Sequence, residues 1–182
     1  MKTAKAVLLT LLVVVALGIT GVYVFLSVGA MPANADAKPY PLERWAAKRS
    51  LHATIAREAP KGDNPVKKTD ADLIAGIKLY AENCAVCHGA EDGKASNTAK
   101  GLYQRPPQLA EHGVEDDDAG ETYWKIFHGI RLTGMPSYHY ALSQHQIWQL
   151  TLFLQYMDQL PPKAEKVWKA VPSQAPKIKA EG

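Results

Sequence analysis

The distribution of apolar residues divides the chain into one long apolar segment and several shorter segments with a helical period. Residues 6–28 are almost uniformly apolar and carry no charge. At about 1.5 Å per residue, a helix over this segment is roughly 34 Å long, enough to cross the hydrocarbon core of a bilayer. Farther along, apolar residues recur every three or four positions, and no segment alternates as a β-strand does. The pattern predicts an all-α protein.

Three of the shorter segments also carry signals for helix ends. The first helix is predicted to begin after Thr69, a favourable N-cap, and to lead into a pair of cysteines. Its apolar stripe consists of Leu73, Ile77, Tyr80 and Cys84. The second helix is predicted over residues 119–128, with Gly129 as its stop. The third covers residues 144–159 and follows Ser143, which has the spacing of a capping box with Gln146.

The apolar segment at residues 6–28 is interpreted as a retained membrane anchor. Lys2 and Lys5 precede it and no acidic residue does, so the positive-inside rule leaves the N-terminus in the cytoplasm. The alternative is a cleaved signal peptide, for which small-residue sites exist at residues 33–35 and 35–37, although the apolar region of a signal peptide is shorter, about 7–15 residues. Under both interpretations the rest of the chain is exported, as a single-pass protein of the cytoplasmic (inner) membrane if the anchor stays.

The segments on either side of the predicted domain are expected to be less regular. Residues 29–68 are interpreted as a connector, rich in turn signals, with a possible helix over residues 42–58. This helix has Leu42, Trp45, His52 and Ile55 near one face. It is expected to lie on the membrane surface, to pack on the following domain, or simply to act as a spacer. The compact domain is placed at residues 69–160, and the Lys-, Ala- and Pro-rich residues 161–182 are expected to be disordered.

Composition excludes some classes of protein and raises the question of what stabilises the domain. The chain has 21 Lys and Arg against 18 Asp and Glu, which argues against a nucleic-acid-binding protein. It has only two cysteines, so the several disulfides common in small exported domains are excluded. Residues 89–118 lack periodicity, and a loop of about 30 residues is unusual in a compact domain. A large, flat, buried cofactor would explain both features.

The cysteines form the motif Cys84-Ala85-Val86-Cys87-His88, which has the C-x-x-C-H pattern of covalent haem attachment. The two thiols would add to the two haem vinyl groups, and His88 would be the proximal iron ligand. A thioredoxin-like dithiol is the first alternative, but it belongs in a βαβ setting that the pattern lacks. A structural zinc site is the second, and it needs further ligands where no second cysteine pair exists.

An electron carrier also needs a second axial ligand, because six-coordinate iron changes its geometry little between oxidation states. Met135 is the leading candidate, since Gly134 lets the backbone come close and Pro136 stiffens the loop. A thioether ligand favours Fe(II) and raises the reduction potential. The other candidates are Met31, Met157, His128, His139 and His145, of which His139 ranks next.

From about residue 70 to residue 160 the sequence resembles class I cytochromes c, which are domains of three or more helices around one covalent haem. The resemblance rests on the C-x-x-C-H motif, on Gly134-Met135-Pro136, and on an aromatic-rich last helix. The run from Thr122 to Pro136 also resembles cytochrome c subunits of membrane oxidases and periplasmic dehydrogenases. The resemblance thus implies an N-terminal transmembrane helix followed by a cytochrome c fold of three to five helices.

The resemblance also implies roles for single residues. Cys84 and Cys87 would be the thioether sites, and His88 and Met135 the axial ligands. The carbonyl of Pro107 would accept a hydrogen bond from the His88 ring. In the helices, Gly76 and Tyr80 would pack against Trp148 and Tyr156.

The function predicted from these features is single-electron transfer by one covalent haem c outside the cytoplasmic membrane. The partners would be redox proteins of a respiratory or dehydrogenase chain. No nucleic acid, small-molecule substrate or catalytic residue is expected, so the protein would not itself be an enzyme. One alternative is a haem subunit of a larger oxidase or dehydrogenase. Another is a haem enzyme or gas sensor in which the sixth ligand can be displaced.

Overall fold

The computed structural model describes residues 2–175, and within them all regular secondary structure is helical. The chain forms two compact units, residues 1–37 and residues 38–182. The first unit contains helix α1 (Lys2–Ser27). Within this helix, the segment Thr3–Ser27 is long enough and apolar enough to cross a membrane. The predicted all-α class, with an apolar N-terminal helix as a candidate membrane span, is therefore confirmed.

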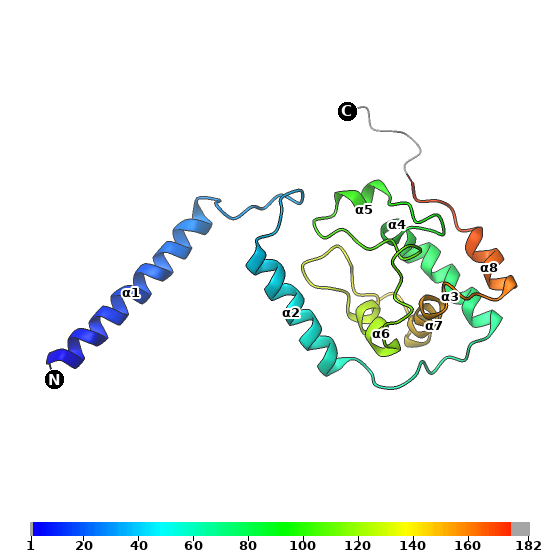
Figure 1. Cartoon of the computed structure of the whole chain (residues 1–182), viewed down its shortest axis with the longest axis horizontal. Coiled ribbons are helices and arrows are strands. Elements are labelled where there is room, and N and C mark those ends of the chain that lie inside the picture. Colours follow the sequence, from blue (N-terminus) through cyan, green and yellow to red (C-terminus); the bar gives the residue numbers. More distant parts are fainter. Residues whose placement is uncertain (1, 176–182) are drawn as a thin grey trace, which may run out of the picture. The chain divides into compact units, whose positions relative to one another are not determined.

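In the second unit, most of the remaining helices contribute to one main core (Figure 1). Helix α3 (Asp70–Asn83) packs across α7 (Gln144–Gln155), and α6 (Ala119–His128) lies against α7. A single turn, α4 (Ala85–His88), follows α3 directly. The other helices are α2 (Pro41–Glu58), α5 (Asn97–Gly101) and α8 (Pro162–Lys169).

The capping residues begin and end these helices at nearly the predicted positions. The Thr69 side chain accepts a hydrogen bond from the Asp72 backbone N–H, and Ser143 forms the full capping box with Gln146. Gly129 ends α6 with a φ of 68°, a conformation that favours glycine. Helix α7 ends at Gln155, earlier than the predicted residue 159. The predicted 89–118 loop also contains the short helix α5.

Helices α3 and α7 approach closely because α3 carries a glycine at the crossing. A Cβ on Gly76 would lie 2.3 Å from the Gln149 carbonyl oxygen and 2.8 Å from Phe153 Cβ. The buried Tyr80 ring meets Phe153 edge to face, with ring centroids 5.4 Å apart. The prediction that Trp148 and Tyr156 pack against Gly76 and Tyr80 at this crossing is wrong. Trp148 stacks instead on Tyr123, with centroids 4.1 Å apart, and the Tyr156 ring lies beneath the Lys68 ammonium.

The expectation that residues 161–182 are disordered is also wrong for their first part, because residues 162–169 form α8. Ala164 and Trp168 are buried, four positions apart on one face of α8. The Trp168 ring packs against Tyr80 and Phe153, with centroids 5.4 and 5.1 Å apart. The region is rich in Lys, Ala and Pro, so its composition did not predict a helix. Two buried residues of that helix nevertheless complete the core. Residues 176–182 lie outside the part that the structure describes.

Replacing Trp168 with alanine tests whether α8 is a true part of the domain. The side chain is 4% exposed, and truncating such a residue typically costs about 3–5 kcal/mol in the free energy of unfolding. Trp45→Ala is the matched control, because Trp45 is 65% exposed and its loss should change stability by about 0.5 kcal/mol or less. Denaturant unfolding followed by circular dichroism measures both. Equal stabilities for the two variants would contradict the packing of α8.

Helix α2 forms where it was predicted but uses a different face. Ile55, Ala59 and the partly buried Leu51 pack with Trp124 of α6 in a small second cluster. Leu42 and Trp45 are 73% and 65% exposed. Of the apolar face predicted for α2, only the Ile55 end is therefore buried. The contacting residues recur every four positions, which puts them on one side of the helix.

Candidate functional site

The cysteine motif lies on the single turn that joins α3 to the loops. Backbone N–H groups of Cys87 and His88 bond to the Cys84 carbonyl at 3.0 and 2.8 Å. The turn ends at Gly89, whose φ is 78°. The side chains of Cys84, Cys87 and His88 therefore come from one short, hydrogen-bonded turn at the end of a buried helix.

Side chains from distant parts of the unit hold the backbone of this turn in place. The Tyr80 hydroxyl donates to the Gly89 carbonyl at 2.9 Å. Ser96 donates to the Val86 carbonyl, Gln108 to the Cys87 carbonyl and Tyr138 to the Asn83 carbonyl, at 2.6, 3.1 and 2.8 Å. Sequence reasoning singled out Tyr80, through the apolar stripe of its helix. It missed the other three donors, which come from irregular segments and carry no periodic signal.

The His88 ring is oriented by the backbone of the loop that contains Pro107. Its Nδ1 lies 3.0 Å from the Pro107 carbonyl oxygen. A carbonyl only accepts, so the Nδ1 carries the proton, and in the neutral ring the lone pair is on Nε2. Burial lowers the pKa of His88 and outweighs the opposing effect of the Pro107 hydrogen bond. The neutral imidazole that a metal requires is thereby favoured.

The two cysteines lie in surroundings that favour uncharged sulfur. Burial, assisted by the nearby Cys87, raises the pKa of Cys84 to about 12. Burial also raises the pKa of Cys87. Both groups are therefore neutral thiols at pH 7. An uncharged thioether would suit the same surroundings, whereas a thiolate would be disfavoured.

Met135 lies in a tightly closed loop after α6. Its carbonyl accepts from the Ile130 backbone N–H at 3.2 Å, and its own N–H donates to Thr133 Oγ1 at 3.1 Å. A Cβ on Gly129 would lie 2.7 Å from the Met135 carbonyl oxygen. The backbone of Met135 is therefore fixed on both sides.

All six residues predicted for the site line one apolar cavity of about 330 Å³. They are Cys84, Cys87, His88, Pro107, Gly134 and Met135. The rival ligands lie elsewhere: Met157 is buried in the helical core, and His139 bonds to Ser137 Oγ at 2.6 Å through its ring. Met31, His128 and His145 do not line the cavity either. Among residues 2–175 no group of three or more His, Cys, Asp or Glu is placed to hold a metal ion.

The lining of this cavity fits a haem. Most of it is apolar, as the flat body of a porphyrin requires, and it includes Leu109, Ile126 and Leu154. The Thr122 hydroxyl is buried there without a hydrogen-bond partner. Lys125 and Arg105 also line the cavity. A buried unsatisfied donor and the Arg105 guanidinium suit a ligand with an apolar body and carboxylate edges.

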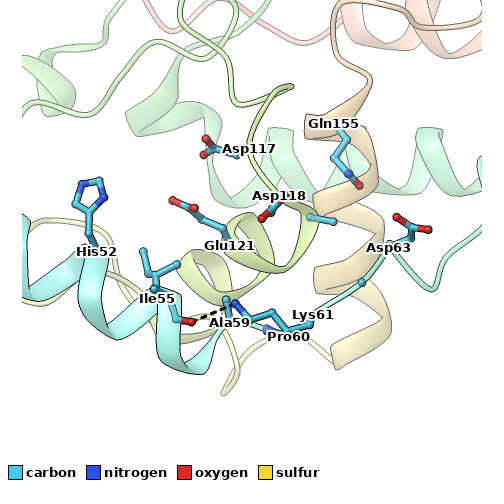
Figure 2. Close-up of a pocket in the computed structure, with 13 residues that line it drawn as sticks. His52, Ile55, Ala59, Pro60, Lys61, Asp63, Asp117, Asp118, Glu121 and Gln155 are labelled. Carbon is cyan, nitrogen blue, oxygen red and sulfur yellow. Dashed lines mark hydrogen bonds between the residues drawn. The ribbon is translucent and has the colours of Figure 1, made fainter.

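A second, larger cavity of about 670 Å³ has a different character (Figure 2). Its lining comes from the end of α2, the loop after it, α6 and α7. Asp117 and Glu121 of this lining each pair with Lys125, which lines the smaller cavity, at 3.0 and 2.8 Å. Burial tends to lower the pKa of Lys125, but these two carboxylates outweigh it and raise the pKa. No thiol or thioether lines this cavity, so the smaller apolar cavity is the candidate cofactor site.

Comparison with known protein families supports the apolar cavity as the cofactor site. Residues 71–154 match the sequence model of the family described as cytochrome C oxidase, cbb3-type, subunit III. The chain is also similar to a protein named GTPase Obg from Desulfatibacillum aliphaticivorans, at 27% identity over 81 residues. That similarity covers 44% of this chain and 24% of the relative, and this sequence lacks the G-x-x-x-x-G-K-[S/T] phosphate-binding loop. No solved structure matches the chain.

The family match and the geometry concern the same residues. The matched segment contains the cysteine motif, Pro107 and Met135, and Cys84, Cys87, His88, Pro107 and Met135 line the same apolar cavity. Residues 71–154 thus form a class I cytochrome c domain, a haem-binding electron-transfer domain of the kind found in membrane oxidases. In the sequence, an apolar helix that is long enough to cross a membrane precedes this domain.

Proposed function

We propose that this protein is a single-electron carrier with one covalent haem c, attached through Cys84 and Cys87 and ligated by His88 and Met135. The observation that carries the proposal is the presence of these four side chains in the lining of one apolar cavity. Bound haem would supply an iron that changes oxidation state by one electron. The chain would supply attachment, orientation and exclusion of water.

Each of the four side chains would have a separate task. The thioethers of Cys84 and Cys87 would fix the cofactor to the turn at the end of α3. The Pro107 carbonyl, 3.0 Å from His88 Nδ1, would orient the imidazole and keep the Nε2 lone pair available to the metal. Met135, held through its backbone by Ile130 and Thr133, would present a thioether that favours the reduced state.

The haem domain would lie outside the cytoplasm, with α1 in the inner membrane. Lys2 and Lys5 precede the apolar helix, and the positive-inside rule keeps them in the cytoplasm. The partners would be redox proteins of a respiratory or dehydrogenase chain. The similarity of residues 71–154 to an oxidase subunit family supports a second form of the same role, in which the protein is a permanent haem subunit of an oxidase complex.

Purification of the full chain from native membranes in mild detergent tests this function. The expected product carries one haem per chain by the pyridine haemochrome assay and has a reduced-minus-oxidised spectrum of the c type. A chain that lacks haem, or releases it to acidified acetone, would contradict the proposal. Elution alone would indicate a shuttle between complexes, whereas stoichiometric partners with other haems or copper would indicate an oxidase subunit.

A further inference from the structure

Helix α2 lies outside the family-matched residues 71–154, yet it contacts the cofactor cavity. Leu51, near its middle, lines that cavity together with Cys84, His88 and Met135. Leu51 is also the partly buried member of the cluster that joins α2 to α6. A segment that the sequence suggested was a connector or spacer thus contributes an apolar side chain to the site.

Two contacts hold α2 on opposite sides of Leu51. Near its start, the Tyr103 hydroxyl donates to Glu43 Oε1 at 2.6 Å, and Tyr103 adjoins Leu102 and Gln104 of the cavity wall. Near its end, Ile55 is 5% exposed and packs on Trp124 of α6. Glu43 and Ile55 are twelve positions apart, which is about 18 Å along the helix. Helix α2 therefore bridges two segments that line the cavity, with Leu51 between its two attachments.

The end of α2 is fitted to α6 by a glycine. A Cβ on Gly120 would lie 1.8 Å from the Pro60 carbonyl oxygen, closer than any substituted residue allows. Pro60 follows α2 after a single residue, Ala59, which is itself buried. The contact requires glycine at this position of α6. The close packing of the end of α2 on α6 therefore depends on Gly120.

We propose that α2 forms an outer wall of the haem cavity, and that Leu51 raises the reduction potential by keeping water away from the cofactor. The inference rests on the proposed function. Oxidation adds a positive charge at the iron, and an apolar wall disfavours that charge because it lowers the local dielectric and excludes water. Removing the apolar side chain of Leu51 should admit water and stabilise the oxidised state.

The test is a potentiometric titration of the full-length chain in detergent, comparing Leu51→Ser with wild type. We expect a lower midpoint potential, with the ratio of oxidised to reduced haem about tenfold higher at the wild-type midpoint, which corresponds to about 59 mV for one electron. Leu42→Ser is the matched control on the same helix, since Leu42 is 73% exposed, and its midpoint should equal that of wild type. Ligation of ferric haem by a methionine thioether gives a weak far-red absorption band. This band should persist in both variants, which would show that the shift does not come from loss of the Met135 ligand.

Gly120→Ala gives an independent test, because it displaces α2 without changing a residue of the cavity lining. It should shift the midpoint in the same direction as Leu51→Ser. If the Leu51→Ser protein does not accumulate in cells, the midpoint of Gly120→Ala alone tests the wall inference. Wild-type midpoints in variants that retain c-type haem would overturn the wall inference alone. A wild-type chain without c-type haem would overturn the proposed function, and the wall inference with it.

Discussion

Replacing both cysteines with serine, Cys84→Ser with Cys87→Ser, is expected to abolish covalent haem attachment completely. A hydroxyl does not replace the thiol in thioether formation, and the chain has only two cysteines, so no other thiol can take over. The cavity of about 330 Å³ would then lack its attached occupant. An apolar cavity that loses its occupant exposes apolar side chains to water, and this cost is large beside the marginal stability of a typical domain. The double variant should therefore also lose helical structure.

Haem-dependent peroxidase staining of a denaturing gel measures attachment directly, and circular dichroism measures the helix content. Val86→Ala is the appropriate control, because Val86 lies between the two cysteines and is 46% exposed. This variant retains both thiols and should stain as wild type does. Haem that remains bound to the double variant on the denaturing gel would show that attachment occurs elsewhere.

Replacing Met135 with alanine should lower the reduction potential strongly while leaving the haem attached. The thioether favours Fe(II), so its loss should lower the midpoint by about 0.2 V, within the roughly 0.8 V range that axial ligands cover. The weak far-red band of the ferric protein should also disappear. Optical spectra combined with a potentiometric titration measure both effects.

Met157→Leu is the matched control for Met135→Ala. Met157 is 8% exposed in the helical core and does not line the cavity. Substitution of leucine for buried methionine conserves volume and usually costs less than about 1.5 kcal/mol. Its midpoint and far-red band should match those of wild type. A far-red band that survives in Met135→Ala would mean that another residue is the sixth ligand.

The regular helices could be predicted because their signals are local. The spacing of apolar residues, the N-caps and a terminal glycine all depend on residues close together in the sequence. The capping box at Ser143, for example, forms as expected. Helix α8 could not be predicted because the composition of the tail is polar overall, while its packing rests on the buried Ala164 and Trp168 and the partly buried Val167 and Val171. The face of α2 was misjudged for a related reason. Which side of a helix is buried depends on the partner, here Trp124, and not on the helix alone.

The candidate site could be predicted in part because its chemistry is concentrated in short motifs. The C-x-x-C-H run and the Gly134-Met135-Pro136 run are contiguous, and the structure places both at one cavity. The hydrogen-bond donors to the motif backbone could not be predicted. Ser96, Gln108 and Tyr138 are common residues in loops, and only the folded chain brings them to their acceptors. The contribution of Leu51 escaped sequence reasoning for the same reason.

The packing of Trp168 on Tyr80 and Phe153 has a consequence for biosynthesis. A ribosome makes Cys84 and Cys87 well before it makes Trp168. Until α8 is added, the core beside Tyr80 lacks one of its large side chains, and the turn that Tyr80 holds through the Gly89 carbonyl is less tightly enclosed. The nascent chain would thus offer its thiols to an attachment enzyme more readily than the finished domain. Because the domain without attached haem is expected to lose helical structure, the last helix would complete the core only after haem is in place.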